Sequence, residues 1–185
     1  MRFRLLSILT ASVGLLVIVA CATNPATGKR QLSLISENQE IEMGRAAAAD
    51  IRQTVGLVTD ADLQRYVERI GKREADGSER PELPWEFHVV DDPGVNAFAL
   101  PGGFIFLTRG MINLMTSEAE LASVLGHEIG HVTARHSVNQ LSKQQVAQLG
   151  LGLGGLLVPE VQSFGSLLGA GLELLFLNEL LIRGR

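Results

Sequence analysis

The sequence has only one cysteine, Cys21, among its 185 residues, so no disulfide can form within the chain and its stability must come from packing or metal binding. Positive charge is not in excess either, since 16 Lys and Arg against 20 Asp and Glu give a net charge of −4. A mildly acidic chain lacks the electrostatic footprint of nucleic-acid binding, which we therefore do not expect. We find no internal repeat and no nucleotide-binding loop. The length allows one domain with a hydrophobic core.

The first 20 residues are typical of a secretory signal peptide. Two arginines precede an uncharged apolar run, Leu5 to Ala20, which is short for a membrane span of roughly 20 residues. The four residues that end at Cys21, "IVAC", resemble the lipobox of bacterial lipoproteins, which implies that Cys21 is lipidated. In such lipoproteins Ala22 after the cysteine implies sorting to the outer membrane. The alternative is a soluble periplasmic protein with an incidental thiol.

The rest of the chain divides into a short connection and one domain. Residues 21–35 carry Pro, Gly and Thr without a clear period and are predicted to be a lipid-anchored tether, with the domain over residues 36–185. Ser36 and Gln39 form a capping-box pattern that predicts a helix start. Asp60 is predicted to cap a second helix, whose apolar residues recur at helical spacing.

Three short strands are predicted after these helices. Residues 85–90 ("WEFHVV") are rich in aromatic and β-branched side chains. Residues 95–100 and 104–110 are expected to be two strands around a glycine turn, and the continuous apolar run of the second predicts burial on both faces. A lone histidine in a strand is usually structural, so we leave His88 out of the candidate site.

The next helix is the best-supported element. Ser117 and Glu120 form a capping-box pattern, and no proline interrupts the chain from Glu118 toward Gln145, so we expect one continuous helix. The chain then becomes glycine-rich and apolar, and its glycines, Pro159 and two glutamates favour helical packing segments over a membrane span. Together these elements predict an α+β domain, mainly helical, with a small sheet before this helix.

The helix carries the motif that dominates the functional prediction. His127 and His131 are four residues apart, so both imidazoles can bind one ion, whereas Glu128 is turned by about 100° and can reach a water on that ion. This arrangement is typical of zinc hydrolysis with a glutamate base. Gly126 and Gly130 leave room beside the ligands. The alternative is an exposed helix with two unrelated histidines.

A third histidine follows closely. His136 is five residues past His131, about 140° round a straight helix, and from there it cannot join the same ion. We interpret His136 and Arg135 as packing groups or as partners of the metal ligands.

Three longer stretches surround the motif: "NPATGKRQLSLISENQEIEMG", "NAFALPGGFIFLTRG" and "SEAELASVLGHEIGHVTARH". Together they resemble the M48 family of zinc metallopeptidases, in particular its bacterial lipoprotein, Oma1-like members. The resemblance implies a gluzincin-like fold, endopeptidase activity, zinc ligands at His127 and His131, and Glu128 as the base. It also implies that the strand Phe104 to Thr108 binds an extended substrate by edge pairing.

In the family, the third zinc ligand is a glutamate on a later helix, within a Glu-x-x-x-Asp pattern. This pattern is absent here, because no Asp follows Asp92 and Arg183 stands where an Asp would follow Glu179. We therefore expect a truncated or frame-shifted C-terminus, and a third ligand outside this chain. Glu173 and Glu179 are the remaining candidates, with Glu160 farther away.

The combined expectation is a zinc-dependent endopeptidase of the bacterial envelope that hydrolyses misfolded or misassembled proteins. It would be an outer-membrane lipoprotein facing the periplasm, with Zn²⁺ as cofactor. Its partners would be protein or peptide substrates, the membrane through its lipid, and the outer-membrane assembly machinery as a further candidate. The alternative is a catalytically inactive lipoprotein that binds clients or assembly partners as a chaperone would.

Overall fold

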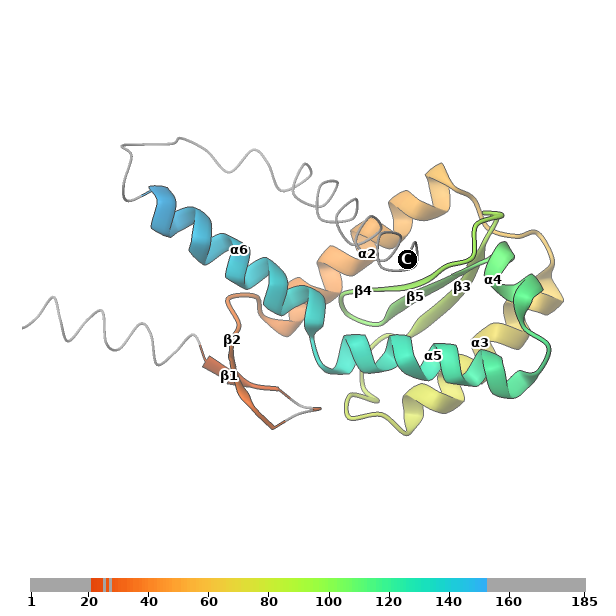
Figure 1. Ribbon diagram of the computed structural model, residues 1–185, viewed down its shortest axis with the longest axis horizontal. Coiled ribbons are helices and arrows are strands. Elements are labelled where there is room, and N and C mark those ends of the chain that lie inside the picture. Colours follow the sequence, from red (N-terminus) through yellow and green to blue (C-terminus); the bar gives the residue numbers. More distant parts are fainter. Residues whose placement is uncertain (1–20, 25, 27, 153–185) are drawn as a thin grey trace, which may run out of the picture. The chain divides into compact units, whose positions relative to one another are not determined.

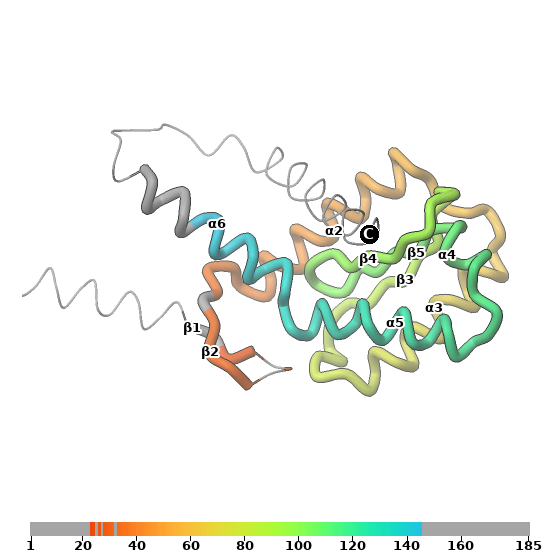
Figure 2. Tube along the Cα trace, viewed as in Figure 1, coloured from red at the N-terminus to blue at the C-terminus, as the bar shows by residue number. Residues whose placement is uncertain are grey.

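The computed structural model describes residues 21–24, 26 and 28–152. The chain separates into two compact units, 1–145 and 146–185, and of the second only the last residues of one helix are described. Along the described residues of the first unit, a hairpin comes first, then two helices, a small sheet, two further helices and the start of a third (Figures 1 and 2). This mixed architecture agrees with the predicted α+β class. No helix in the described part of the chain is both long and apolar enough to cross a membrane.

The two N-terminal helices begin where the caps predict. Helix α2 spans Glu37–Thr54, and both bonds of the capping box between Ser36 and Gln39 are present. Helix α3 spans Ala61–Asp76, and the Asp60 carboxylate accepts hydrogen bonds from the backbone amides of Asp62 and Leu63 in its first turn. The buried side of α3 follows the predicted apolar stripe, with Val67 and Ile70 fully inside.

The sheet has three strands: β3 (Glu86–Val90), β4 (Ala97–Leu100) and β5 (Phe104–Thr108). Their order is β3-β5-β4, with β3 parallel and β4 antiparallel to β5. Strand β5 is buried along its whole length, as its apolar run predicts. Its predicted edge pairing with a substrate is wrong, because both of its edges are already hydrogen-bonded to neighbouring strands.

Helices cover both faces of the sheet. Helices α3 and α5 (Glu118–Thr133) lie along one face, and α2 runs on the other side (Figure 1). Gly44 of α2 allows a close approach to the turn after β4, since a Cβ there would lie 1.8 Å from the Pro101 carbonyl oxygen. Within that turn Gly102 has φ +79°, and a Cβ would also strike the backbone of α2. The core thus fills the space between sheet, α3 and α5.

The C-terminal part of the first unit begins with a short helix, α4 (Arg109–Leu114), which Thr108 caps. The predicted uninterrupted helix over residues 118–145 is wrong. Helix α5 ends at Thr133, Arg135 has a left-handed φ of +52°, and α6 spans His136–Gly152. The helix axis therefore changes direction just after the motif histidines, and His136 leaves the face that a straight helix would give it.

Part of the predicted tether is folded. Strands β1 (Cys21–Thr23) and β2 (Arg30–Leu32) form an antiparallel hairpin. The Asn24 side chain donates to the Ala134 carbonyl oxygen at 2.7 Å, at the end of α5. The hairpin thus packs against the end of α5 through Asn24. The signal peptide lies outside the described residues, and the division of the chain into signal, tether and domain stays a prediction.

Candidate metal centre

Helix α5 presents its motif on the boundary between core and solvent. Leu121, Leu125 and Ile129 are buried and fix the rotation of the helix against the sheet and α3. The N-terminus is held by Ser117, whose hydroxyl accepts from the Glu120 amide. The second half of the predicted capping box is not formed, because the Glu120 carboxylate accepts from Thr116 instead.

The two histidines meet as the spacing predicts. His127 is exposed and His131 half-buried, and their Nε2 atoms are 3.0 Å apart, with the rings at 75°. Glu128, one position after His127, is buried to 8% exposure. A Cβ at Gly126 or Gly130 would meet no atom within 4 Å, so the space beside the ligands is open, as expected.

This donor set fits zinc. Two neutral imidazoles that coordinate one tetrahedral ion through bonds of 2.0–2.1 Å place their nitrogens about 3.3 Å apart, close to the separation found here. At this separation either one nitrogen carries a hydrogen that the other accepts, or both lone pairs point at a shared cation, since two bare lone pairs would repel each other. His127 and His131 would thus hold the ion. Among the residues that the structure describes, no third His, Cys, Asp or Glu completes a metal cluster.

The other predicted residues lie in different places. Glu160, Glu173 and Glu179 are outside the described residues, so the structure leaves the third-ligand prediction untested. Cys21 begins β1. His88 lies on β3 as expected, and its Nε2 is 3.1 Å from both Arg52 and Glu86.

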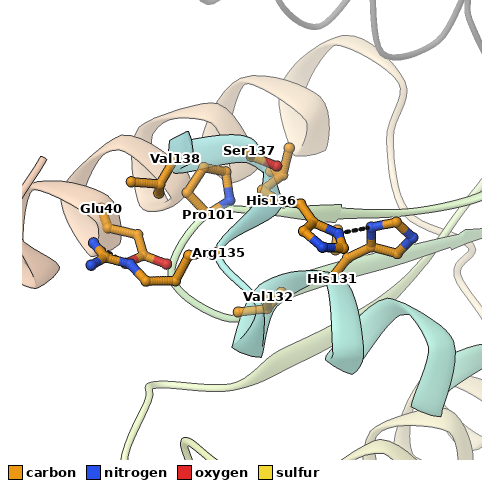
Figure 3. A pocket seen from close by; sticks show the side chains of 10 residues that line it. Glu40, Pro101, His131, Val132, Arg135, His136, Ser137 and Val138 are labelled. Carbon is orange, nitrogen blue, oxygen red and sulfur yellow. Dashed lines mark hydrogen bonds and ion pairs between the residues drawn. The ribbon is translucent and has the colours of Figure 1, made fainter. Parts of the chain in front are cut away.

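His136 does not lie about 140° away from His131, as a straight helix would place it, because the helix breaks between them. Its Nδ1 lies 2.9 Å from Nδ1 of His131, and the two rings meet edge to face at 75° (Figure 3). The break at Arg135 brings it there. The interpretation of Arg135 as a packing group agrees with the structure, since Arg135 donates to Glu40 and to the Ile35 carbonyl oxygen.

A buried ion cluster beside the motif helix escaped the sequence analysis. Glu40 is 1% exposed and accepts from Arg80 through both carboxylate oxygens, and Arg135 shares one of them. Burial by itself would lower the pKa of Arg80, but Glu40 and Glu37 outweigh it and raise that pKa. The signal was available, because Glu40 falls on the same stripe of α2 as the buried Met43.

A second polar link joins α3 to the start of α5. Glu118 accepts from the Tyr66 hydroxyl at 3.0 Å and from Arg73 at 3.2 Å. The hydrogen bond from Tyr66 and then that from Arg73 lower the pKa of Glu118 below its ordinary value of 4.5.

Comparison with known proteins places this geometry in a family. Residues 61–182 match the model of peptidase family M48. The chain is 34% identical over 121 residues to a beta-barrel assembly-enhancing protease of Yersinia pestis. The aligned region covers 65% of this chain and 25% of that protein. It is 32% identical over 123 residues to the protein of the same name from Escherichia coli K12. That alignment covers 66% of this chain and 25% of the relative.

A eukaryotic relative matches over a longer range. The chain is 33% identical over 154 residues to the mitochondrial metalloendopeptidase OMA1 of Schizosaccharomyces pombe. The aligned region covers 78% of this chain and 46% of that protein. The chain therefore spans from a quarter to just under half of these relatives. Because the family model covers the two motif histidines and most of the described domain, the chain belongs to peptidase family M48.

Proposed function

We propose that this chain is a zinc-dependent endopeptidase of the bacterial envelope that hydrolyses misfolded or misassembled proteins. The observation that carries the proposal is the pair of Nε2 atoms from His127 and His131, 3.0 Å apart on one helix turn, with Glu128 between them. The family match and the relatives named metalloendopeptidases support the chemistry. The names of the bacterial relatives support an envelope role and, as partner, the outer-membrane assembly machinery.

The roles of the three residues follow from their places on α5. His127 and His131 would hold the metal, which when bound would lower the pKa of its water and polarise a substrate carbonyl. Glu128 points away from the histidine face by about 100° and sits at the edge of the core. Its carboxylate takes a proton from the attacking water and delivers it to the leaving amide nitrogen.

The finer features belong to the same proposal. We take the domain to have the gluzincin-like fold, with His127 and His131 as two of the zinc ligands. In the family the third ligand is a glutamate of a later helix, and Glu173 and Glu179 are the candidates that this chain offers. We take Cys21 to carry the lipid that holds the domain on the periplasmic side of the outer membrane, since the apolar run and "IVAC" support it.

The test is the Glu128→Gln variant of the full chain, with casein as substrate. Gln keeps the shape but cannot act as a base, so we expect hydrolysis to fall by about 10²–10⁴-fold while bound zinc is retained. Glu120→Gln, an exposed change on the same helix, is the control and should keep full activity. Equal hydrolysis by the Glu128 variant and the parent would refute the assigned base. A parent that binds unfolded proteins without cleaving them would favour the chaperone-like alternative.

A further inference from the structure

The contact between His136 and His131 has a defined chemistry. Their Nδ1 atoms are 2.9 Å apart, so one of them carries the hydrogen and the other accepts it. The opposite nitrogen of His131, Nε2, faces Nε2 of His127. A histidine that offers an Nε2 lone pair must carry its hydrogen on Nδ1. In the arrangement that holds a metal between His127 and His131, His131 is therefore the donor, and His136 is the acceptor with its own hydrogen on Nε2.

We propose that His136 is a positioning residue of the metal centre. By accepting from His131 Nδ1–H, it fixes both the ring orientation and the tautomer in which Nε2 of His131 faces His127. Metal-bound histidines generally need such a partner on the other ring nitrogen, and losing it commonly weakens metal affinity by about 10 to 100-fold. This inference rests on the proposed function, because it assumes that His127 and His131 hold the metal.

The surrounding fold keeps His136 in place although its side chain is exposed. Arg135, with its left-handed backbone, is anchored by the buried Glu40 at 2.9 Å. The preceding carbonyl, that of Ala134, accepts from Asn24. The turn is thus held from α2 on one side and from the N-terminal hairpin on the other. Figure 3 shows the Arg135 side chain directed to Glu40 and the His136 ring directed to His131.

Two substitutions separate this role from a merely structural one. His136→Leu keeps a side chain of similar length but removes the acceptor. His136→Asn places an amide oxygen close to the position of Nδ1 and restores the acceptor. Gln140→Leu, an exposed position one turn along α6, controls for adding an apolar side chain to this helix.

The first measurement is zinc affinity of the full chain by competition with a chelator. We expect His136→Leu to weaken zinc binding by about 10 to 100-fold, and His136→Asn to stay within about threefold of the parent. Gln140→Leu should not differ from the parent. Unchanged affinity in the Leu variant, or an Asn variant as weak as the Leu variant, would overturn the proposal.

The second measurement needs no metal. Long-range ¹H–¹⁵N correlation spectra of the zinc-free chain report which nitrogen of His131 carries hydrogen. We expect Nδ1–H in the parent and in His136→Asn, and a shift of the population toward Nε2–H in His136→Leu. A parent with His131 in the Nε2–H form, or a Leu variant with an unchanged tautomer, would contradict the proposal. A chain that bound no zinc at all would refute the proposed function, and these spectra would still decide the role of His136.

Discussion

The buried ion cluster offers a sharp test of what holds the motif helix in place. Glu40, 1% exposed, accepts two hydrogen bonds from Arg80, whose side chain is 3% exposed, and one from Arg135. Replacing Glu40 by Gln keeps the shape but removes the only fully buried negative charge of the cluster. Both guanidinium groups then lose the charge that compensates them inside the protein.

The size of the effect follows from what remains. Breaking a buried ion pair by removing one partner costs about 3–5 kcal/mol. We expect Glu40→Gln to lower the free energy of unfolding by about 3 kcal/mol, the lower end of that range. Arg80 keeps two partners, Glu37 at 2.9 Å and the Val132 carbonyl oxygen at 3.3 Å. For a chain of this length, about 3 °C of Tm per kcal/mol gives a fall of about 9 °C.

Urea unfolding followed by tryptophan fluorescence measures this change. The single tryptophan, Trp85, is buried and donates to the Arg80 carbonyl oxygen, so its emission reports on this part of the core. The matched control is Glu42→Gln, whose ion pair with Arg45 is exposed on the same helix and should contribute under about 0.5 kcal/mol. A free energy of unfolding for Glu40→Gln within about 0.5 kcal/mol of that of the parent would show that the cluster does not stabilise the turn after α5.

Two further predictions concern Cys21, at the start of β1, and Glu118, at the start of α5. Cys21→Ser should leave the chain without lipid and release it from membranes on carbonate washing; equal retention of both forms, with no lipid mass on the parent, would rule out the anchor. The stability that Glu118 adds is present above its unfolded pKa, which is close to the ordinary 4.5, and is lost as the pH falls through the lower folded value. The Tm difference between the parent and Glu118→Gln should therefore be larger at pH 7 than at pH 3, and a difference independent of pH would contradict the role of Tyr66.

Local signals predicted the elements that position the motif. The caps at Ser36, Asp60 and Ser117 mark the helix starts because each side chain accepts from an otherwise unpaired amide of the first turn. The burial of β5 on both faces was evident from its apolar run. The two histidines meet because a helix brings positions four apart together, and this geometry needs no tertiary information.

Tertiary contacts decided what the sequence analysis missed. Nothing in "TARHS" carries the Gly or Pro that commonly ends a helix, and the left-handed Arg135 is held by Glu40, which is 95 residues earlier in the chain. The strand order could not be predicted from local patterns either, since β3 pairs in parallel with β5 and skips β4. The hairpin does have a local signal, because Asn and Gly favour turns, and Gly28 adopts φ +66° in the turn that Asn24 begins.

Zinc binding measured by equilibrium dialysis tests the central claim most directly. The account predicts one zinc site in the full chain that is lost in His127→Ala and in His131→Ala and kept in Glu128→Gln, because the two imidazoles hold the ion and the carboxylate acts on the water. The ratio of bound zinc to protein in these three variants is the decisive quantity. Zinc binding that survived removal of either histidine, or that disappeared with the Glu128 substitution, would contradict the account.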